Sequence, residues 1–190
     1  MQKGRDDAVI VVDMLRGFHN LGNLKNPRTG KVILPIKNLL ERKTRKEGCF
    51  TVFLQDWHKK NDPEFNIFPE HCVRAGERKI IDKLREFSLL PNSQVVPKST
   101  YSGFYGTRLG LRLQIKNPAR VIVVGVCSDI CVLHTVTDLR KRNYPVIVPA
   151  DCVETFDAPG HEAEAQNTWV LSHMENILGA TVVQNANEIT

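Results

Sequence analysis

The stretch that decides the fold class is Val121-Ile122-Val123-Val124-Gly125-Val126-Cys127-Ser128-Asp129-Ile130-Cys131. Its first half is almost wholly apolar and rich in β-branched residues, which is typical of a central strand buried on both faces of a parallel sheet. We predict this strand at residues 120–126. Ser128 and Asp129 then carry short polar side chains that can cap the first turn of a helix. A buried strand that leads directly into a helix indicates a parallel α/β fold.

The rest of the chain repeats this alternation of short apolar runs and longer amphipathic stretches. Strands are predicted at residues 8–13, 50–55, 94–97, 120–126, 145–149 and 181–183, and helices at about residues 32–46, 79–86, 106–114, 129–142 and 160–178. We therefore expect one α/β domain over residues 1–190, a Rossmann-like three-layer sandwich in which helices cover both faces of a six-stranded parallel sheet. The irregular segment 57–75 is too long for a plain connector, and long loops are often functional.

The bulk composition is that of one globular domain. The chain has 190 residues, of which 42% are hydrophobic and 25% charged, and this suits a single well-packed core. No apolar run approaches the ~18 residues of a membrane span, and residues 1–5 lead into no signal-peptide core. The five cysteines are an odd number without zinc-finger spacing. We therefore expect reduced thiols in a cytoplasmic protein that has no membrane partner.

The net charge of +5 raises the question of nucleic-acid binding. The basic clusters at residues 42–46 and 140–142 fall where the last turn of a helix is expected, and cations there complement the helix dipole. No basic and aromatic residues interleave along one face of a predicted element. We therefore expect no nucleic-acid partner, and a salt-dependent gel shift would distinguish this alternative from an enzyme.

Reactive side chains follow four of the predicted strands, at the sheet edge where parallel α/β folds bind ligands. Asp13 ends the first strand, Asp56 and His58 follow the second, and Lys98 follows the third. The central strand leads to Cys131. Because the carboxyl ends of parallel strands share one edge, two carboxylates, an imidazole, an amine and a thiol are predicted to converge there.

Cys131 is expected in the first turn of its helix, where the helix dipole favours a thiolate and backbone N–H groups can hold an oxyanion. By itself, a cysteine at this place can equally be a buried residue that packs as a small hydrophobe. Asp13 beside the thiol can accept its proton, and Lys98 between them can hold both anions. His134 is an alternative base, but its position one turn further along the helix favours a packing residue in the core.

Five pieces of sequence, in this order and at these spacings, carry a resemblance to a known family. They are Val11-Val12-Asp13 with Gly17-Phe18; Asp56-Trp57-His58; Phe68-Pro69-Glu70-His71-Cys72-Val73; Lys98-Ser99-Thr100-Tyr101-Ser102-Gly103-Phe104; and Gly125-Val126 with Cys131-Val132. From Val9 to about Val183 the chain resembles the isochorismatase-like cysteine hydrolases, the family that includes nicotinamidase and pyrazinamidase. The resemblance implies a catalytic triad of Asp13, Lys98 and Cys131. It also implies a cis peptide bond between Val126 and Cys127, with an oxyanion hole formed by the backbone N–H groups of Cys127 and Cys131.

The nicotinamidase branch of this family holds a divalent metal beside the thiol. The resemblance assigns the metal ligands to Asp56, His58, Glu64 and His71. This mixture of imidazole and carboxylate suits Zn²⁺, with Fe²⁺ or Mn²⁺ as alternatives. Without the resemblance, the histidines can be ordinary loop residues and Asp56 a cap at the end of a strand.

The resemblance also implies the substrate. Phe18, Phe68 and Tyr105 match positions that line a flat pocket for a pyridine ring, although aromatic residues such as Phe68 also pack in cores. The implied reaction is hydrolysis of nicotinamide to nicotinic acid and ammonia through a thioester. The alternatives are a family hydrolase that acts on another amide, a carbamoyl compound or an enol ether, and a catalytically silent member that binds small molecules. Members of the family are often dimers or tetramers, so a homo-oligomer is expected.

Overall fold

A computed structural model of the chain describes residues 6–190. Residues 1–5, where the predicted domain begins and on which the signal-peptide interpretation rests, lie outside the described residues. The sheet within the described range is parallel throughout. Its strands are β1 (Ala8–Val12), β2 (Phe50–Asp56), β3 (Ser93–Lys98), β4 (Val121–Val126), β5 (Val146–Pro149), β6 (Val153–Glu154) and β7 (Thr181–Val183).

The strand order confirms the predicted α/β class and corrects the predicted number of strands. The order is β3-β2-β1-β4-β5-β7, and β6 pairs with β4, which gives seven strands in the described chain instead of six. The start of β4 pairs with β5, and Gly125 and Val126 at its end pair with Val153 and Glu154 of β6. A strand of two residues is too short to show an alternating pattern, so the sequence carries no signal for it. The six predicted strands are all present, each within one residue of its predicted ends.

The helices lie close to their predicted positions. They are α1 (Thr29–Leu40), α2 (Asp82–Ser88), α3 (Leu109–Lys116), α4 (Leu133–Lys141) and α5 (Ala163–Asn176). The α1 helix continues into a π-helical turn (Glu41–Lys46), another π-helical turn (Ser128–Val132) precedes α4, and short 3₁₀ turns occur at Arg16–Phe18, Pro63–Asn66, Ala150–Cys152 and Ala186–Glu188. Basic residues occupy the last turns of Glu41–Lys46 and of α4, as predicted.

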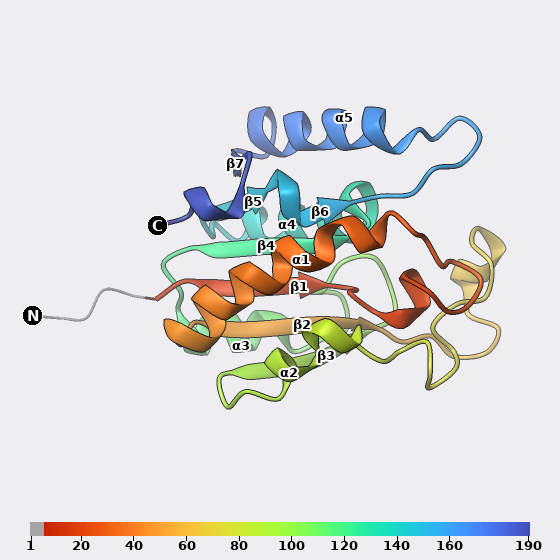
Figure 1. The fold of residues 1–190 in the computed structure, drawn as a ribbon, viewed down its shortest axis with the longest axis horizontal. Helices are drawn as coiled ribbons and strands as arrows, with labels where there is room; N and C mark the ends of the chain where they lie inside the picture. The colour runs from red at the N-terminus through yellow and green to blue at the C-terminus, as the bar shows by residue number, and fades with distance from the viewer. Residues whose placement is uncertain (1–5) are drawn as a thin grey trace, which may run out of the picture.

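The two faces of the sheet carry separate hydrophobic clusters, as β1 demonstrates. Val9 and Val11 belong to the cluster that includes the buried faces of α1 and α2. Ala8, Ile10 and Val12 belong to the cluster that includes buried residues of α3, α4 and α5. In Figure 1, α1 lies in front of the sheet, whereas α3 and α4 lie behind it. A strand whose side chains alternate between two cores explains why β1 is apolar at every position.

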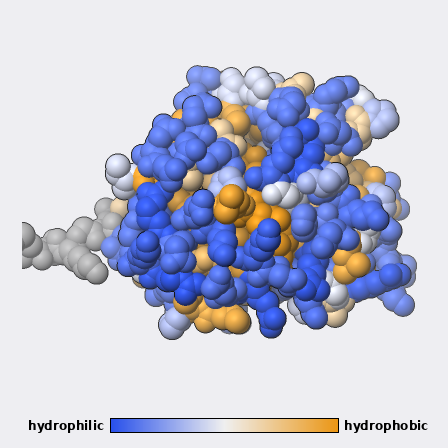
Figure 2. Space-filling model, in the orientation of Figure 1, coloured by the Kyte–Doolittle hydropathy of each residue, from blue (hydrophilic) through white to orange (hydrophobic). Residues whose placement is uncertain are grey.

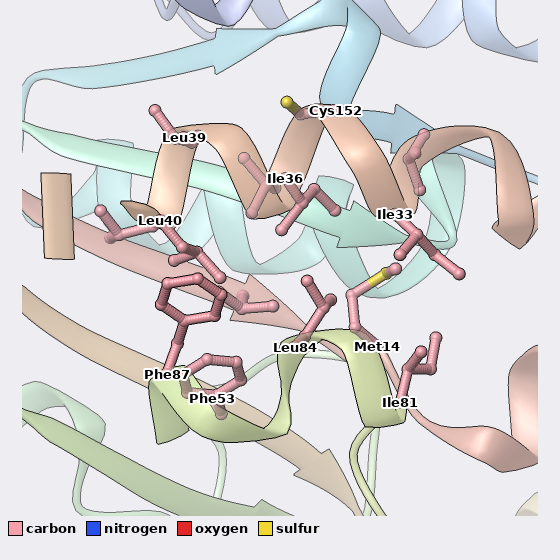
Figure 3. Packing of buried hydrophobic residues seen from close by; sticks show 14 of the residues in the cluster. Met14, Ile33, Ile36, Leu39, Leu40, Phe53, Ile81, Leu84, Phe87 and Cys152 are labelled. Carbon is pink, nitrogen blue, oxygen red and sulfur yellow. The ribbon is translucent and has the colours of Figure 1, made fainter. Parts of the chain in front are cut away.

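The cluster on the α1 face is closely interdigitated. Figure 3 shows Leu40 of α1 and Phe87 of α2 approaching Phe53 of β2, with Met14 and Leu84 beside them. At most 1% of each of these five side chains is exposed. The outer surface in Figure 2 is mainly hydrophilic, with a smaller apolar area over α1. None of the helices in residues 6–190 combines the length and the apolar character that crossing a membrane requires.

A buried ion cluster fastens the amino-terminal end of the sheet. The carboxylate of Asp7, just before β1, accepts two hydrogen bonds of 2.8 Å from Arg120 and lies 3.3 Å from Lys43 Nζ. The Lys43 side chain is only 3% exposed, and Glu47 is its second partner at 2.9 Å. Burial disfavours the charge of Asp7, but Arg120 and Lys43 outweigh this effect and lower the pKa of Asp7.

Replacement of this carboxylate therefore has a predictable cost. Asp7→Ala leaves buried Lys43 with Glu47 as its remaining carboxylate, so we expect a loss of about 3 kcal/mol in the free energy of unfolding, measured by urea denaturation at pH 7. The exposed neighbour is a matched control, and Asp6→Ala is expected to change stability by less than about 0.5 kcal/mol. Because the pKa of Asp7 is lowered in the folded state, the difference from the wild type shrinks as the pH falls below 3.8. Equal stabilities of the two variants would contradict the cluster's role.

Candidate active site

The site is assembled at the carboxyl ends of β1, β2, β3 and β4. Asp13 follows β1, Asp56 and Lys98 are opposite one another at the ends of β2 and β3, and Cys131 lies in the Ser128–Val132 turn after β4. The ends of β1 and β4 approach so closely that a Cβ at Gly125 would lie 2.0 Å from the carbonyl oxygen of Val12. Glycine at position 125, with φ of 122°, is therefore required for this approach. The predicted convergence of reactive side chains is present.

Lys98 is the contact that joins the reactive groups. Its Nζ lies 2.7 Å from Asp13 Oδ2, 3.1 Å from Asp56 Oδ1 and 3.6 Å from Cys131 Sγ. The Lys98 side chain is 0% exposed and that of Asp13 is 1% exposed. An ammonium that contacts two carboxylates and a thiol in a buried site can stabilise each of their anionic forms.

The pKa shifts of Asp13 and Cys131 indicate which group carries the proton in the resting site. Burial raises the pKa of Asp13 to about 6; the Asp56 charge adds to this rise and Lys98 opposes it. Burial also raises the pKa of the Cys131 thiol well above its ordinary value, although the Lys98 ammonium opposes that shift. At neutral pH the resting thiol is therefore protonated and Asp13 is ionised. The side chain of Asp13 is in hydrogen-bonding contact with Cys131 and can therefore take the proton of the thiol.

The turn that carries Cys131 begins differently from the prediction. The peptide bond between Val126 and Cys127 is cis, as expected. The residue at the N-cap position, however, is Cys127, and neither Ser128 nor Asp129 caps the helix. Ser128 Oγ donates to Asn167 Oδ1 at 2.6 Å, and Asp129 accepts a hydrogen bond of 2.6 Å from Thr155 Oγ1. These side chains make long-range contacts instead of local ones, because β6 and α5 bring polar partners to the turn.

The prediction that His134 packs in the core is wrong. His134 is exposed, and its Nδ1–H donates to the Ile130 carbonyl at 2.7 Å. Its ring lies 5.3 Å from that of Tyr101. The buried positions of α4 are Thr135, Val136 and Leu139, so the adjacent His134 faces outward.

Beside the triad, Asp56, His58 and His71 form a buried cluster with the spacing of a metal site. Their ligand atoms lie within 4.8 Å of one another. Asp56 Oδ2 and His58 Nε2 are 3.1 Å apart, yet neither forms a hydrogen bond with the described residues. His71 Nδ1–H donates to the Pro69 carbonyl at 2.8 Å, which leaves its Nε2 lone pair 3.3 Å from Asp56 Oδ2. Buried carboxylate oxygens and imidazole nitrogens that face one another without hydrogen-bond partners are suitable ligands for a divalent cation.

Glu64 is the fourth residue beside this cluster. Its Oε1 lies 3.6 Å from His71 Nε2 and 3.9 Å from His58 Nε2. The 3₁₀ turn Pro63–Asn66 positions it, because Asp62 caps this turn by accepting from the Glu64 N–H at 3.0 Å. The other oxygen of Asp62 lies 3.1 Å from His58 Nδ1. The four residues assigned from the resemblance are therefore together, and a carboxylate stands behind one imidazole.

Arg78 fastens the backbone at both histidines. Its Nε donates to the Cys72 carbonyl at 2.7 Å, and its Nη2 donates to the His58 carbonyl at 2.9 Å. Its guanidinium lies over the Trp57 ring, 4.1 Å from the ring centroid. Cys72 directly follows His71, so one planar guanidinium sets the separation of the two imidazole-bearing segments.

A cavity of about 390 Å³ opens over the thiol and the cluster. Among its lining residues are Asp13, Asp56, Glu64, His71, Cys127 and Cys131. Phe18 and Phe68 line it, as the resemblance implied. Tyr105 does not: its side chain is 75% exposed, and Tyr101 lines the cavity instead. Both tyrosines lie in an irregular turn region before α3, where no periodicity indicates which side chain points inward.

The other walls of the cavity come from two loops that the sequence did not indicate. Asn26 and Arg28 enter from the segment before α1, and Phe156 and Asp157 from the segment after β6. An ion pair of 3.1 Å between Arg28 and Asp157 joins the two loops across the cavity. No local motif marks these residues, because their placement depends on contacts across more than a hundred positions of the chain.

The parallel α/β fold, with a thiol, a lysine and an aspartate at the carboxyl edge, is that of a hydrolase with a cysteine in its pocket. The chain belongs to the isochorismatase family, because the isochorismatase domain model matches residues 7–176. An uncharacterized isochorismatase-family protein, PncA of Bacillus subtilis strain 168, is 30% identical over 186 residues, 93% of this chain and 98% of that protein.

The chain is also similar to solved structures over nearly its whole length. The crystal structure of N-carbamoylsarcosine amidase from Thermoplasma acidophilum is 32% identical with a TM-score of 0.82, over 97% of this chain and 98% of that one. The structure of pyrazinamidase of Pyrococcus horikoshii in complex with zinc is 29% identical with a TM-score of 0.79, over 94% and 99% of the two chains. The similarity thus extends over nearly the whole length of each protein.

The role of Arg78 predicts a change in metal affinity. Arg78→Lys keeps the charge but loses the two-pronged contact with the carbonyls, so we expect Zn²⁺ to bind about tenfold more weakly, as replacements behind metal ligands commonly do. Competition with a chromogenic chelator measures the affinity in the purified protein. Arg74→Lys, an exposed change in the same loop, is the control. An affinity equal to that of the control would refute the role assigned to Arg78.

Proposed function

We propose that this protein hydrolyses nicotinamide to nicotinic acid and ammonia, with Cys131 as the nucleophile. The observation that carries the proposal is the position of Lys98, within 3.6 Å of the Cys131 thiol and 2.7 Å of Asp13 in a buried site. A nucleophile, a base and a cation that holds both anions are the parts that a thioester mechanism requires. The aromatic residues Phe18, Phe68 and Tyr101 supply apolar walls for a flat ring.

The proposed chemistry begins with proton transfer. Asp13 accepts the Cys131 proton, and the thiolate attacks the amide carbon, while the backbone N–H groups of Cys127 and Cys131 hold the oxyanion. Each such donor contributes roughly 3–4 kcal/mol in comparable sites. Protonated Asp13 then gives its proton to the leaving nitrogen as the C–N bond breaks, so ammonia departs and a thioester remains. Asp13, ionised again, takes a proton from water as the water attacks the thioester. It returns this proton to the departing Cys131 thiolate as nicotinic acid is released.

The residues that would hold a divalent metal are Asp56, His58, Glu64 and His71. Two imidazoles with two carboxylates suit Zn²⁺ first, with Fe²⁺ or Mn²⁺ as alternatives. When bound, the metal supplies a Lewis acid that orients and polarises the ligand beside the thiol. The zinc complex of the related pyrazinamidase supports this assignment. Asp56 contributes to both groups, because its Oδ1 receives the Lys98 hydrogen bond while its Oδ2 faces the imidazoles.

A second candidate substrate is a carbamoyl amide. The 32% identity to N-carbamoylsarcosine amidase supports it, and so does the polar wall formed by Asn26, Arg28 and Asp157. Ammonia release from a panel of nicotinamide, pyrazinamide and N-carbamoyl amino acids distinguishes the candidates. The proposal further includes a cytoplasmic homo-oligomer without a nucleic-acid partner, which size-exclusion chromatography and a gel shift would test.

Loss of the thiol tests the nucleophile directly. Cys131→Ala is expected to reduce ammonia release from nicotinamide to the level without enzyme, because no other group can form the thioester. Cys49→Ala is the matched control and is expected to retain activity. Cys49 is buried just before β2, at the end of the strand away from the active site. An enzymatic assay for ammonia on metal-loaded protein measures both. Appreciable turnover by the Cys131 variant would eliminate the proposed mechanism.

The base assigned to Asp13 predicts an acid limit to activity. Because the pKa of Asp13 is raised to about 6, the carboxyl is protonated at lower pH and is then unable to accept the thiol proton. We expect kcat/KM for nicotinamide to fall as the pH decreases, with a midpoint near 6. Asp13→Asn is expected to lower kcat by about 10²–10⁴-fold. A pH profile that stays flat between pH 5 and 7 would argue against Asp13 as the base.

A further inference from the structure

The loop after β6, residues 155–162, forms part of the cavity wall and contacts the turn that carries the nucleophile. Phe156 and Asp157 line the cavity, and a backbone bridge between Ala158 and His161 closes the loop at its outer end. We call this segment the Phe156 loop. It contains an imidazole, that of His161, which neither the triad nor the metal cluster uses.

His161 joins the Phe156 loop to the Ser128–Val132 turn through both of its ring nitrogens. Its Nε2 lies 2.7 Å from Asp129 Oδ2, and its Nδ1 lies 2.8 Å from the carbonyl oxygen of Phe156. The ring stacks on that of Phe156, with centroids 4.1 Å apart and planes inclined by 10°. Asp129 precedes Cys131 by two residues. One side chain therefore contacts both the pocket wall and the side chain of Asp129 in the turn that carries the nucleophile.

These contacts determine the protonation state of His161. A backbone carbonyl and an ionised carboxylate can only accept hydrogen bonds, so each ring nitrogen must donate. A neutral imidazole has one N–H, whereas the imidazolium has two. Both hydrogen bonds therefore form together only in the cation. Asp129 stabilises that cation, because it raises the pKa of His161 against the effect of burial.

Of the other charges around the Phe156 loop, Glu162 at its end is exposed. The remaining charges are paired with one another. Arg28 lies 3.1 Å from Asp157, 3.2 Å from Glu154 and 2.6 Å from Glu164, and Lys31 lies within 3.7 Å of both glutamates. The Ser128–Val132 turn contributes Asp129, and α5 contributes Glu164 at its start. Within the described residues, Asp129 is the charged group in direct contact with the His161 ring.

We propose that His161 is a positioning residue for substrate binding: as an imidazolium it fastens the Phe156 loop to the nucleophile turn, and its deprotonation removes one of its two hydrogen bonds and loosens this wall of the pocket. The cation is present below the pKa of the folded-state group and is lost as the pH rises through it. Substrate affinity is therefore expected to fall on the alkaline side, with KM rising about tenfold while kcat changes little, because the reacting groups keep their own contacts.

Nuclear magnetic resonance of the intact protein tests the proposal without relying on turnover. The His161 ring signals, assigned by their loss in His161→Phe, are expected to titrate above the ordinary imidazole pKa of about 6.5. In Asp129→Asn the midpoint is expected to move to lower pH. Backbone ¹⁵N relaxation is expected to show the Phe156 loop becoming more mobile above that midpoint. A neutral ring at pH 6, or a loop whose order does not change through the titration, would overturn the proposal.

Kinetics supply the functional half of the test and rest on the proposed nicotinamidase activity. KM for nicotinamide is expected to rise at the midpoint found by resonance, to be raised at all pH values in His161→Phe, and to be unaffected in His173→Asn, a control on α5 outside the cavity. A KM that is independent of pH and of His161 would overturn the positioning role. If nicotinamide is not turned over at all, the proposed function fails, and the resonance results alone decide the role of His161.

Discussion

The site depends on the burial of one ammonium among two carboxylates and a thiol. Lys98 contacts Asp13, Asp56 and Cys131 simultaneously, and without it the two carboxylates would be buried at the carboxyl edge of the sheet with no ammonium between them. Burial strengthens each of these interactions and raises the pKa of Asp13 into the range of a useful base. Because Asp56 belongs both to this group and to the imidazole cluster, the thiol chemistry and the proposed metal site share one electrostatic unit.

Much of this arrangement could be predicted from the sequence, because it depends on strands and on their ends. The strands before Asp13 and Cys131 are buried on both faces and apolar throughout, and a short apolar run precedes Lys98. These patterns placed the three residues at one edge of the sheet. The resemblance then located the cluster of Asp56, His58, Glu64 and His71, whose residues lie within one loop region. The positions of the strand ends were sufficient for the catalytic residues, whereas the metal-ligand cluster also required the resemblance.

The features that could not be predicted depend on contacts between distant segments. Tyr101 and Tyr105 occupy the same irregular region, and only its tertiary packing decides which ring faces the cavity. The capping prediction for Ser128 and Asp129 failed because Asn167, Thr155 and His161 compete successfully for these side chains. The strand β6 is too short to show a pattern, yet it directs the Phe156 loop to the pocket. The periodicity of the sequence therefore does not predict which side chains link one loop to another.

The most direct test of the central claim is to trap the covalent intermediate. Metal-loaded protein is mixed with nicotinamide, quenched in acid during turnover, digested and analysed by mass spectrometry. We expect a nicotinoyl group attached to the peptide at Cys131, and its absence from the same peptide in Cys131→Ala. Turnover of nicotinamide with the acyl group found on Cys127 instead of Cys131 would show that Cys131 is not the nucleophile.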